Sequence, residues 1–143
     1  MRRMERAEAF TFLAHGTRTG KLATVRPDGR PHVASVWFVV DGDDLVFMTM
    51  GTSVKGRNLL ASGRAALTVD LEEPPYAFVT VEGPVTLTAE DPGLLAWATR
   101  IGHRYMGEDR AEEFGRRNAV PEELLVRLHA ERVLARDDVA GYG

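Results

Sequence analysis

The sequence predicts a mainly β domain, a small closed barrel of antiparallel strands with short helices around it. Three observations lead to this fold class. Short apolar runs are separated by turns rich in glycine, proline and aspartate, as in a series of β-hairpins. Residues 76–89 alternate apolar and polar side chains over an unusual length, and Gly83 and Pro84 in their middle are typical of a strand that bends at a barrel corner. Helical spacing is confined to short segments.

The first half of the chain predicts one helix and then a meander of strands. Residues 4–15 place Ala9, Phe10 and Leu13 on one side of a helix, and Gly16 is a typical helix stop. Turn sequences such as Pro-Asp-Gly then separate apolar runs that favour strands. The strands are expected at residues 21–26, 32–40 and 45–50.

The second half begins with a helix that Ser53 caps and that ends near Gly63. Strands are expected at residues 65–71 and 76–89. Asp91 and Pro92 then predict the start of a helix that reaches Gly107. A short helix at 109–117, and a last strand from 124 with a bulge near residue 132, complete the chain. Hairpins, a bend and one long strand favour a barrel over a sandwich or a βαβ sheet.

Composition limits the partners. The 143 residues are 44% apolar, enough for one domain that spans residues 1–143. The net charge of −3 argues against a nucleic-acid partner. The longest apolar run, residues 36–40, is far shorter than a membrane span. The chain has no cysteine, and Glu5 and Glu8 make its start unlike a signal peptide, so a cytoplasmic location is expected.

Several common catalytic devices are absent from the sequence. There is no Gly-x-Ser-x-Gly elbow, no pair of histidines with metal-ligand spacing and no thiolate. The segment Gly-Thr-Ser-Val-Lys-Gly lacks the Gly-Lys-Ser/Thr order of a P-loop. We therefore expect no metal, and the sequence assigns no catalytic residue. His103 and Tyr105 are the candidate proton donors.

A strand-to-helix turn at residues 51–57 is the strongest candidate for a site. Cations are unfavourable in the first turn of a helix, yet Lys55 and Arg57 lie there, behind the hydroxyl of Ser53. Lys55 is also one of only two lysines among 18 basic residues. Exposed amides, hydroxyls and cations at a helix start form a general anion site. A flat ring could pack on the neighbouring apolar residues Trp37, Met48 and Met50. The alternative is that Lys55 is a solvated surface residue and that these three belong to the core.

Four segments carry a resemblance to a known family: LATVRPDGRPH, TSVKGRNL, YAFVTVEGPVTL and IGHRYMG. Together they resemble the pyridoxamine 5′-phosphate oxidase-like superfamily of split β-barrel flavin and deazaflavin proteins. The resemblance implies a split barrel of six to seven antiparallel strands. It also implies a homodimer whose cofactor lies in a groove at the subunit interface.

The resemblance further implies which residues form this groove. The phosphate or other anionic tail groups of the cofactor would be held by Ser53, Lys55 and Arg57. The approach would be lined by Thr49, Met50 and Thr52. The ring would be bordered by Ser35, Val36 and Trp37. The second subunit would close the groove with the strand that contains Phe78.

The chain also departs from the true pyridoxamine phosphate oxidases. Ser35 stands where those proteins have an arginine that grips the phosphate of FMN, and they carry a glutamine near the position of Phe78. The pattern is more similar to the branch that uses the deazaflavin coenzyme F420, which is common in actinobacteria. A basic complement made almost wholly of arginine fits a GC-rich genome of that kind.

The expected function is therefore that of a coenzyme F420-dependent oxidoreductase. It would transfer a hydride between the deazaflavin and a small unsaturated organic substrate. Two alternatives stay open: an FMN-binding oxidoreductase of the same family, and a non-catalytic carrier of flavin, deazaflavin or haem.

Overall fold

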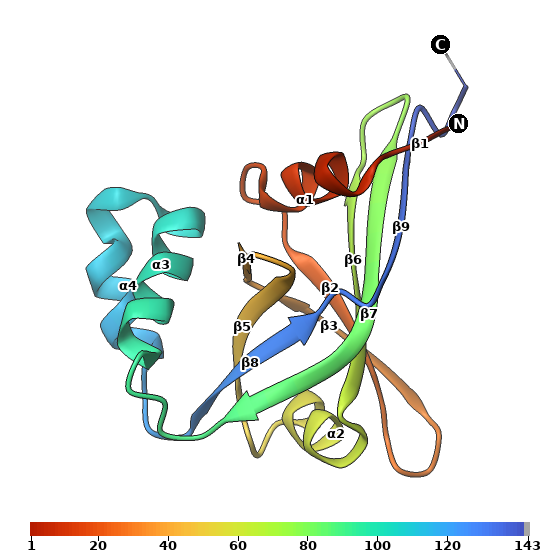
Figure 1. Ribbon diagram of the computed structural model, residues 1–143. Helices are drawn as coiled ribbons and strands as arrows, with labels where there is room; N and C mark the ends of the chain where they lie inside the picture. The colour runs from red at the N-terminus through yellow and green to blue at the C-terminus, as the bar shows by residue number, and fades with distance from the viewer. Residues whose placement is uncertain (142–143) are drawn as a thin grey trace.

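The computed structural model describes residues 1–141. The strands are β1 (Arg2–Arg3), β2 (Gly20–Val25), β3 (Pro31–Val36), β4 (Val39–Asp41), β5 (Asp44–Met50), β6 (Arg64–Leu71), β7 (Ala77–Thr88), β8 (Glu123–His129) and β9 (Arg132–Asp137). The helices are α1 (Arg6–Ala14), α2 (Val54–Ser62), α3 (Leu94–Met106), the 3-10 turn η1 (Glu108–Arg110) and α4 (Ala111–Asn118). Figure 1 shows the strands wrapped around one another, with α3 and α4 set to one side.

The strands form an antiparallel barrel. Hydrogen-bonded neighbours follow the order β3-β2-β6-β7-β8-β5-β4, and β9 pairs with β7 and with β1. The two ends of this order, β3 and β4, are separated in the chain only by Trp37 and Phe38, so one bent strand closes the circle. The prediction of a mainly β barrel of antiparallel strands is confirmed.

The long strand β7 changes partner along its length. Its first part pairs with β9 as far as Glu82, and its last part pairs with β8 from Val85 onwards. Gly83 lies between them, where an added Cβ would collide with the carbonyl oxygen of His129. Glycine therefore allows the close backbone approach at the bend that the sequence predicted here.

Three boundaries differ from the sequence prediction. The expected strand at 32–40 is interrupted at Trp37 and Phe38, where the Phe38 N–H bonds to the Tyr105 hydroxyl (3.2 Å) instead of a neighbouring strand. The expected bulge near residue 132 is a break between β8 and β9. The helix expected from Pro92 begins at Leu94, because the Asp91 carboxylate accepts the Gly93 N–H (2.7 Å) in a preceding turn. The short strand β1 was not predicted.

The barrel encloses the core. The alternation in β7 is confirmed at Ala77, Val79 and Val81, which are buried. Helices α1 and α2 contribute Leu13 and Leu59 to the same core. A second apolar cluster joins α3 to the barrel wall; its buried members are Val39, Val46, Leu94, Ile101 and Leu125. None of the helices within residues 1–141 is long and apolar enough to cross a membrane.

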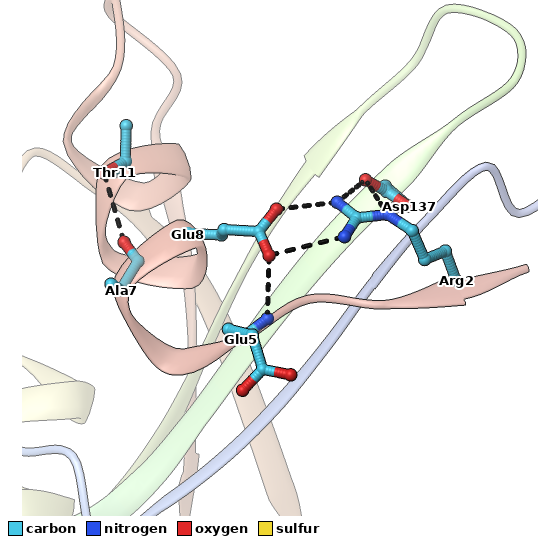
Figure 2. A network of polar contacts seen from close by, with 6 residues as sticks. All are labelled: Arg2, Glu5, Ala7, Glu8, Thr11 and Asp137. Carbon is cyan, nitrogen blue, oxygen red and sulfur yellow. Dashed lines mark hydrogen bonds and ion pairs between the residues drawn. The ribbon is translucent and has the colours of Figure 1, made fainter.

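The start of the chain is fastened to both α1 and β9. Figure 2 shows the Arg2 guanidinium between the carboxylates of Glu8 (2.7 Å) and Asp137 (2.5 Å). The Glu5 N–H donates to Glu8 at the start of α1 (3.2 Å). Together the Arg2 and Glu5 hydrogen bonds hold the pKa of Glu8 below its usual range. These groups are exposed, so they fix the position of the segment more than they stabilise the fold.

Candidate functional site

Ser53 fixes the turn between β5 and α2. Its hydroxyl accepts the N–H of Gly56 (3.0 Å) and donates to the carbonyl of Met50 (2.7 Å). It also contacts the hydroxyl of Thr49 (3.0 Å), which is buried. The predicted helix cap is confirmed, and the Ser53 hydroxyl proton is used in the hydrogen bond to the Met50 carbonyl. The function of this pair is therefore to set the direction of α2 and, with it, the position of Lys55.

A buried polar pair holds α2 against the barrel. The Asn58 side-chain amide donates to the Thr24 hydroxyl (3.0 Å), and both residues are almost fully buried. Gly56 adds a close approach, since a Cβ at this position would meet the carbonyl oxygen of Met50. A buried amide without a partner is costly, so this pairing favours one orientation of the helix. These contacts therefore hold the first turn of α2, which carries Lys55, in one position.

Lys55 lines a cavity of about 320 Å³ between the barrel and the helices α3 and α4. Small-molecule sites range from about 300 to 1,000 Å³, so this cavity has room for part of a cofactor. The apolar part of its wall consists of Val36, Trp37, Met48, Ala98 and Ile101. The polar part of its wall consists of Ser35, Lys55, Arg117, Asn118 and Glu123.

The charged groups of the polar wall come from three separate segments. Lys55 is on α2, Arg117 is near the end of α4, and Glu123 opens β8. The Glu123 Oε2 atom is buried and has no hydrogen-bond partner among the described residues. Burial raises the pKa of Glu123, the Lys55 charge opposes this rise, and Glu122 adds to it. The cavity therefore contains two cations beside a carboxyl group with one oxygen unused.

Trp37 is held by aromatic neighbours. Its ring stacks on Tyr105 at a centroid distance of 5.0 Å and an interplanar angle of 10°, and Phe114 packs at 5.9 Å. The Tyr105 hydroxyl accepts the Phe38 N–H and donates to the Arg18 carbonyl (3.0 Å). Burial raises the pKa of Tyr105. The Tyr105 hydroxyl is therefore fully used in hydrogen bonds to the backbone. His103 is exposed on α3 outside the cavity lining.

The structure brings together five of the predicted site residues and separates the others. The residues that line the cavity are Ser35, Val36, Trp37, Met48 and Lys55. Thr49 and Ser53 form the turn beneath it, whereas Met50 and Thr52 are exposed at that turn. Phe78 is half-buried on β7, outside the cavity lining.

Arg57 faces a different cavity. It lies with Arg26, Asp28 and Arg30 around a hollow of about 440 Å³ beside the β2–β3 turn. Residues two apart on a helix do not share a face, so Lys55 and Arg57 point in different directions. The arginine that lines the cavity together with Lys55 is Arg117. Helical spacing alone was a signal against pairing Lys55 with Arg57.

Five lining residues were missed by sequence reasoning. They are Ala98, Ile101, Arg117, Asn118 and Glu123. The apolar spacing of Ala98 and Ile101 predicted a helix, but nothing in the sequence placed that helix beside Lys55. Arg117 and Glu123 had no local signal beyond their charge.

The lining matches the chemistry of a flavin or deazaflavin. Such a cofactor has a flat ring, which suits the wall around Trp37 and Met48, and an anionic tail, which suits Lys55 and Arg117. Glu123 is a further polar residue of the lining, although its Oε2 atom is itself enclosed by the protein. Within residues 1–141, no cluster of three or more His, Cys, Asp or Glu side chains could hold a metal ion.

Comparisons with known proteins agree with the fold. A family model described as pyridoxamine 5′-phosphate oxidase matches residues 6–137. No curated protein matches the chain significantly. The conserved hypothetical protein Rv2991 from Mycobacterium tuberculosis is 26% identical, with a TM-score of 0.81 over 94% of this chain and 86% of that one.

Two further structures are similar. A protein named F420 reductase is 29% identical, with a TM-score of 0.67 over 85% of this chain and 93% of that one. A FAD-binding protein from Mesorhizobium loti is 19% identical, with a TM-score of 0.69 over 94% and 95% of the two chains, and shows likeness of fold alone. The split-barrel architecture expected from the sequence is confirmed.

Proposed function

The chain belongs to the pyridoxamine 5′-phosphate oxidase family, and on that premise we propose that it is a coenzyme F420-dependent oxidoreductase. It transfers a hydride between the deazaflavin and a small unsaturated organic substrate. The observation that carries the proposal is the cavity that Lys55 and Arg117 line together with the apolar residues around Trp37. The likeness to an F420 reductase at 29% identity supports the choice of cofactor. Ser35, in place of the arginine implied for FMN enzymes, supports the same choice.

The residues of the cavity have distinct roles in this proposal. Lys55 and Arg117 neutralise the anionic tail, and the fixed first turn of α2 keeps Lys55 in place for it. Trp37 and Met48 pack against the ring and keep water from it. The bound cofactor supplies the hydride chemistry, and the protein supplies binding, orientation and exclusion of water.

We also propose that the working form is a homodimer. On the outer face of the barrel, register places Ser35, Lys21 and Thr68 in one row and Val33, Ala23 and Ala66 in the next. Val33 is 67% exposed on this face. Ser35 belongs both to this face and to the cavity lining, so a second subunit docked here would border the cavity.

A cofactor titration tests the proposal. The purified protein is titrated with coenzyme F420 and, separately, with FMN, and binding is followed by cofactor fluorescence. We expect binding of coenzyme F420, weaker or no binding of FMN, and oxidation of the reduced deazaflavin by an α,β-unsaturated acceptor.

Three results would contradict the proposed function, each in a different way. Selective binding of FMN would make the protein a flavin enzyme of the same family. Binding of coenzyme F420 without any oxidation of its reduced form, across a panel of acceptors, would make it a carrier. Failure of both cofactors to bind would remove the assignment of the cavity.

A further inference from the structure

The carboxyl group of Glu123 is left unexplained by the packing of the barrel. Glu123 opens β8 and is half-buried, with its Oε2 atom fully enclosed and without a hydrogen-bond partner among the described residues. Buried polar atoms are almost always paired, because an unpaired one forfeits the hydrogen bonds that it makes in water. An acidic oxygen enclosed in this way favours a protonated carboxyl group, and the same residue lines the cavity.

The charged groups around Glu123 define its setting. Lys55 from α2 and Arg117 from α4 line the same cavity, and the exposed Glu122 precedes Glu123 in the chain. The lining residues of β3 and α3, together with Met50 opposite on β5, bear no titratable group. An anion held between Lys55 and Arg117 would therefore share the cavity with a single carboxyl group.

Two like charges in one small cavity repel each other. A bound phosphate group would raise the affinity of Glu123 for a proton, because the charged carboxylate becomes less favourable beside a second anion. A protonated carboxyl group, by contrast, can donate a hydrogen bond to a phosphate oxygen. Anion and carboxyl group thus become compatible when they share one proton.

We propose that Glu123 is a ligand-binding residue of the anion site, and that its protonated carboxyl group donates a hydrogen bond to the phosphate group of the cofactor. The inference rests on the proposed function, because it takes the phosphate to lie between Lys55 and Arg117. Its consequence is that the complex takes up a proton when the cofactor binds. Burial, which already raises the pKa of Glu123, acts in the same direction.

Proton uptake gives the site a pH dependence of known sign. Above the pKa of Glu123 in the free protein and below its pKa in the complex, affinity falls as pH rises, by up to tenfold per pH unit. The phosphate of FMN has its second pKa near 6, so measurements between pH 7 and 8.5 isolate the protein group. Replacement of Glu123 by glutamine keeps a hydrogen-bond donor and removes the titration.

The experiment is isothermal titration calorimetry with coenzyme F420 and with FMN, in two buffers of different ionisation enthalpy. The dependence of the apparent enthalpy on the buffer counts the protons taken up. We expect uptake of a measurable fraction of one proton by the wild type. Glu123→Gln should show no uptake and a flat affinity from pH 7 to 8.5. Glu122→Gln is the matched control: it removes a charge that adds to the rise in the pKa of Glu123, but it keeps the titrating carboxyl group and should still show proton uptake.

The outcomes separate this inference from the proposed function. If a cofactor binds in a way that depends on Lys55 but without proton uptake, the inference is wrong and the proposed function stands. Uptake that persists in Glu123→Gln also overturns the inference. Failure of both cofactors to bind overturns both proposals. If Glu123→Gln fails to fold, absence of proton uptake by the wild type still overturns the inference, and the pH dependence of the wild-type affinity is then compared with that of Glu123→Asp, which keeps a carboxyl group.

Discussion

Lys55 and Arg117 reach one cavity from helices that are distant in the sequence. Lys55 is fixed by the capped turn below it, whereas Arg117 is near the end of α4. Lys55 acts on the carboxyl group of Glu123, and the Arg117 guanidinium lies over the Phe114 ring at 5.1 Å. At the scale of single residues, these two cations are the basis of the proposal that the cavity binds an anion.

The first prediction concerns these two cations. Lys55→Ala should weaken binding of coenzyme F420 by about 1.5–3 kcal/mol, or roughly 10- to 150-fold, because a charge-assisted hydrogen bond is lost. Arg117→Ala should weaken it in the same direction. The measurement is a fluorescence titration at fixed ionic strength. Arg116→Ala removes an exposed charge one residue away and is the control, for which little change is expected. Equal affinities in the wild type and Lys55→Ala would refute the assignment.

The second prediction concerns stability and pH. Burial raises the pKa of Glu123 in the folded state above the ordinary value of about 4.3. The folded protein then binds this proton more tightly than the unfolded chain. The resulting stabilisation is complete below about pH 4.3 and is lost as pH rises through the folded-state pKa.

Glu123→Gln should remove this loss. The free energy of unfolding in urea, measured from pH 4 to 8 without ligand, should favour the variant over the wild type progressively as pH rises. Glu122→Gln, whose side chain is exposed, should keep the loss of stability with rising pH and only move it toward lower pH, because Glu122 adds to the rise in the pKa of Glu123. A variant that loses stability relative to the wild type at neutral pH would show that the carboxylate has a partner in solution.

At the scale of elements, the sequence correctly predicted the features that depend on residues close together in the chain. The hydroxyl of Ser53 was expected to cap α2, and its bond to the Gly56 N–H does so. The alternation in β7 correctly gave its buried face. The break at Trp37 and Phe38 was not predictable, because the run around them is uniformly apolar. The interruption depends on Tyr105, a residue far along the chain, whose hydroxyl takes the Phe38 N–H.

The residues of the candidate site also fall into those predicted from local sequence and those that only tertiary packing brings together. Ser35, Trp37, Met48 and Lys55 were found because they lie near one strand-to-helix turn or match the family pattern. The wall from α3, α4 and β8 was missed because only tertiary packing brings it to Lys55. Charge and helical spacing can say that a residue is exposed on a helix, but not which cavity that helix borders.

The third prediction concerns the bend in β7. Gly83→Ala should destabilise the protein by about 1–3 kcal/mol, since its Cβ would collide with the His129 carbonyl at the place where β7 changes partner. Gly51→Ala is the matched control, because the nearest atom to its Cβ would be Leu124 Cδ1 at an ordinary 3.5 Å. Urea unfolding measures both. Equal stability of the two variants would mean that the bend relaxes freely.

At the scale of the whole molecule, the outer face of the barrel exposes several apolar side chains among polar ones. Val25, Val33 and Leu134 are 50%, 67% and 49% exposed. Their strands are joined through β6 and β7 into one continuous sheet, in which Ala23 and Ala66 lie beside Val33 and the polar Lys21 and Thr68 lie in the next row. Exposed apolar side chains rimmed by polar ones are typical of protein–protein interfaces.

The fourth prediction follows from a second copy docked on this face. Val33→Glu should convert the dimer to a monomer, because it buries an unpaired charge in the proposed contact without disturbing the barrel core. Sedimentation velocity at micromolar concentration measures the change. Leu95→Glu, at a residue 52% exposed on α3 outside this sheet, is the control and should leave the mass unchanged.

The same variant connects assembly to the site. Ser35 lies on the outer face and also lines the cavity, so a lost partner should uncover one side of the cofactor. Val33→Glu should therefore weaken binding of coenzyme F420, although its side chain does not line the cavity. A wild-type protein that sediments as a monomer would contradict the dimer. A monomeric Val33→Glu with wild-type affinity would show that one chain completes the cofactor site by itself.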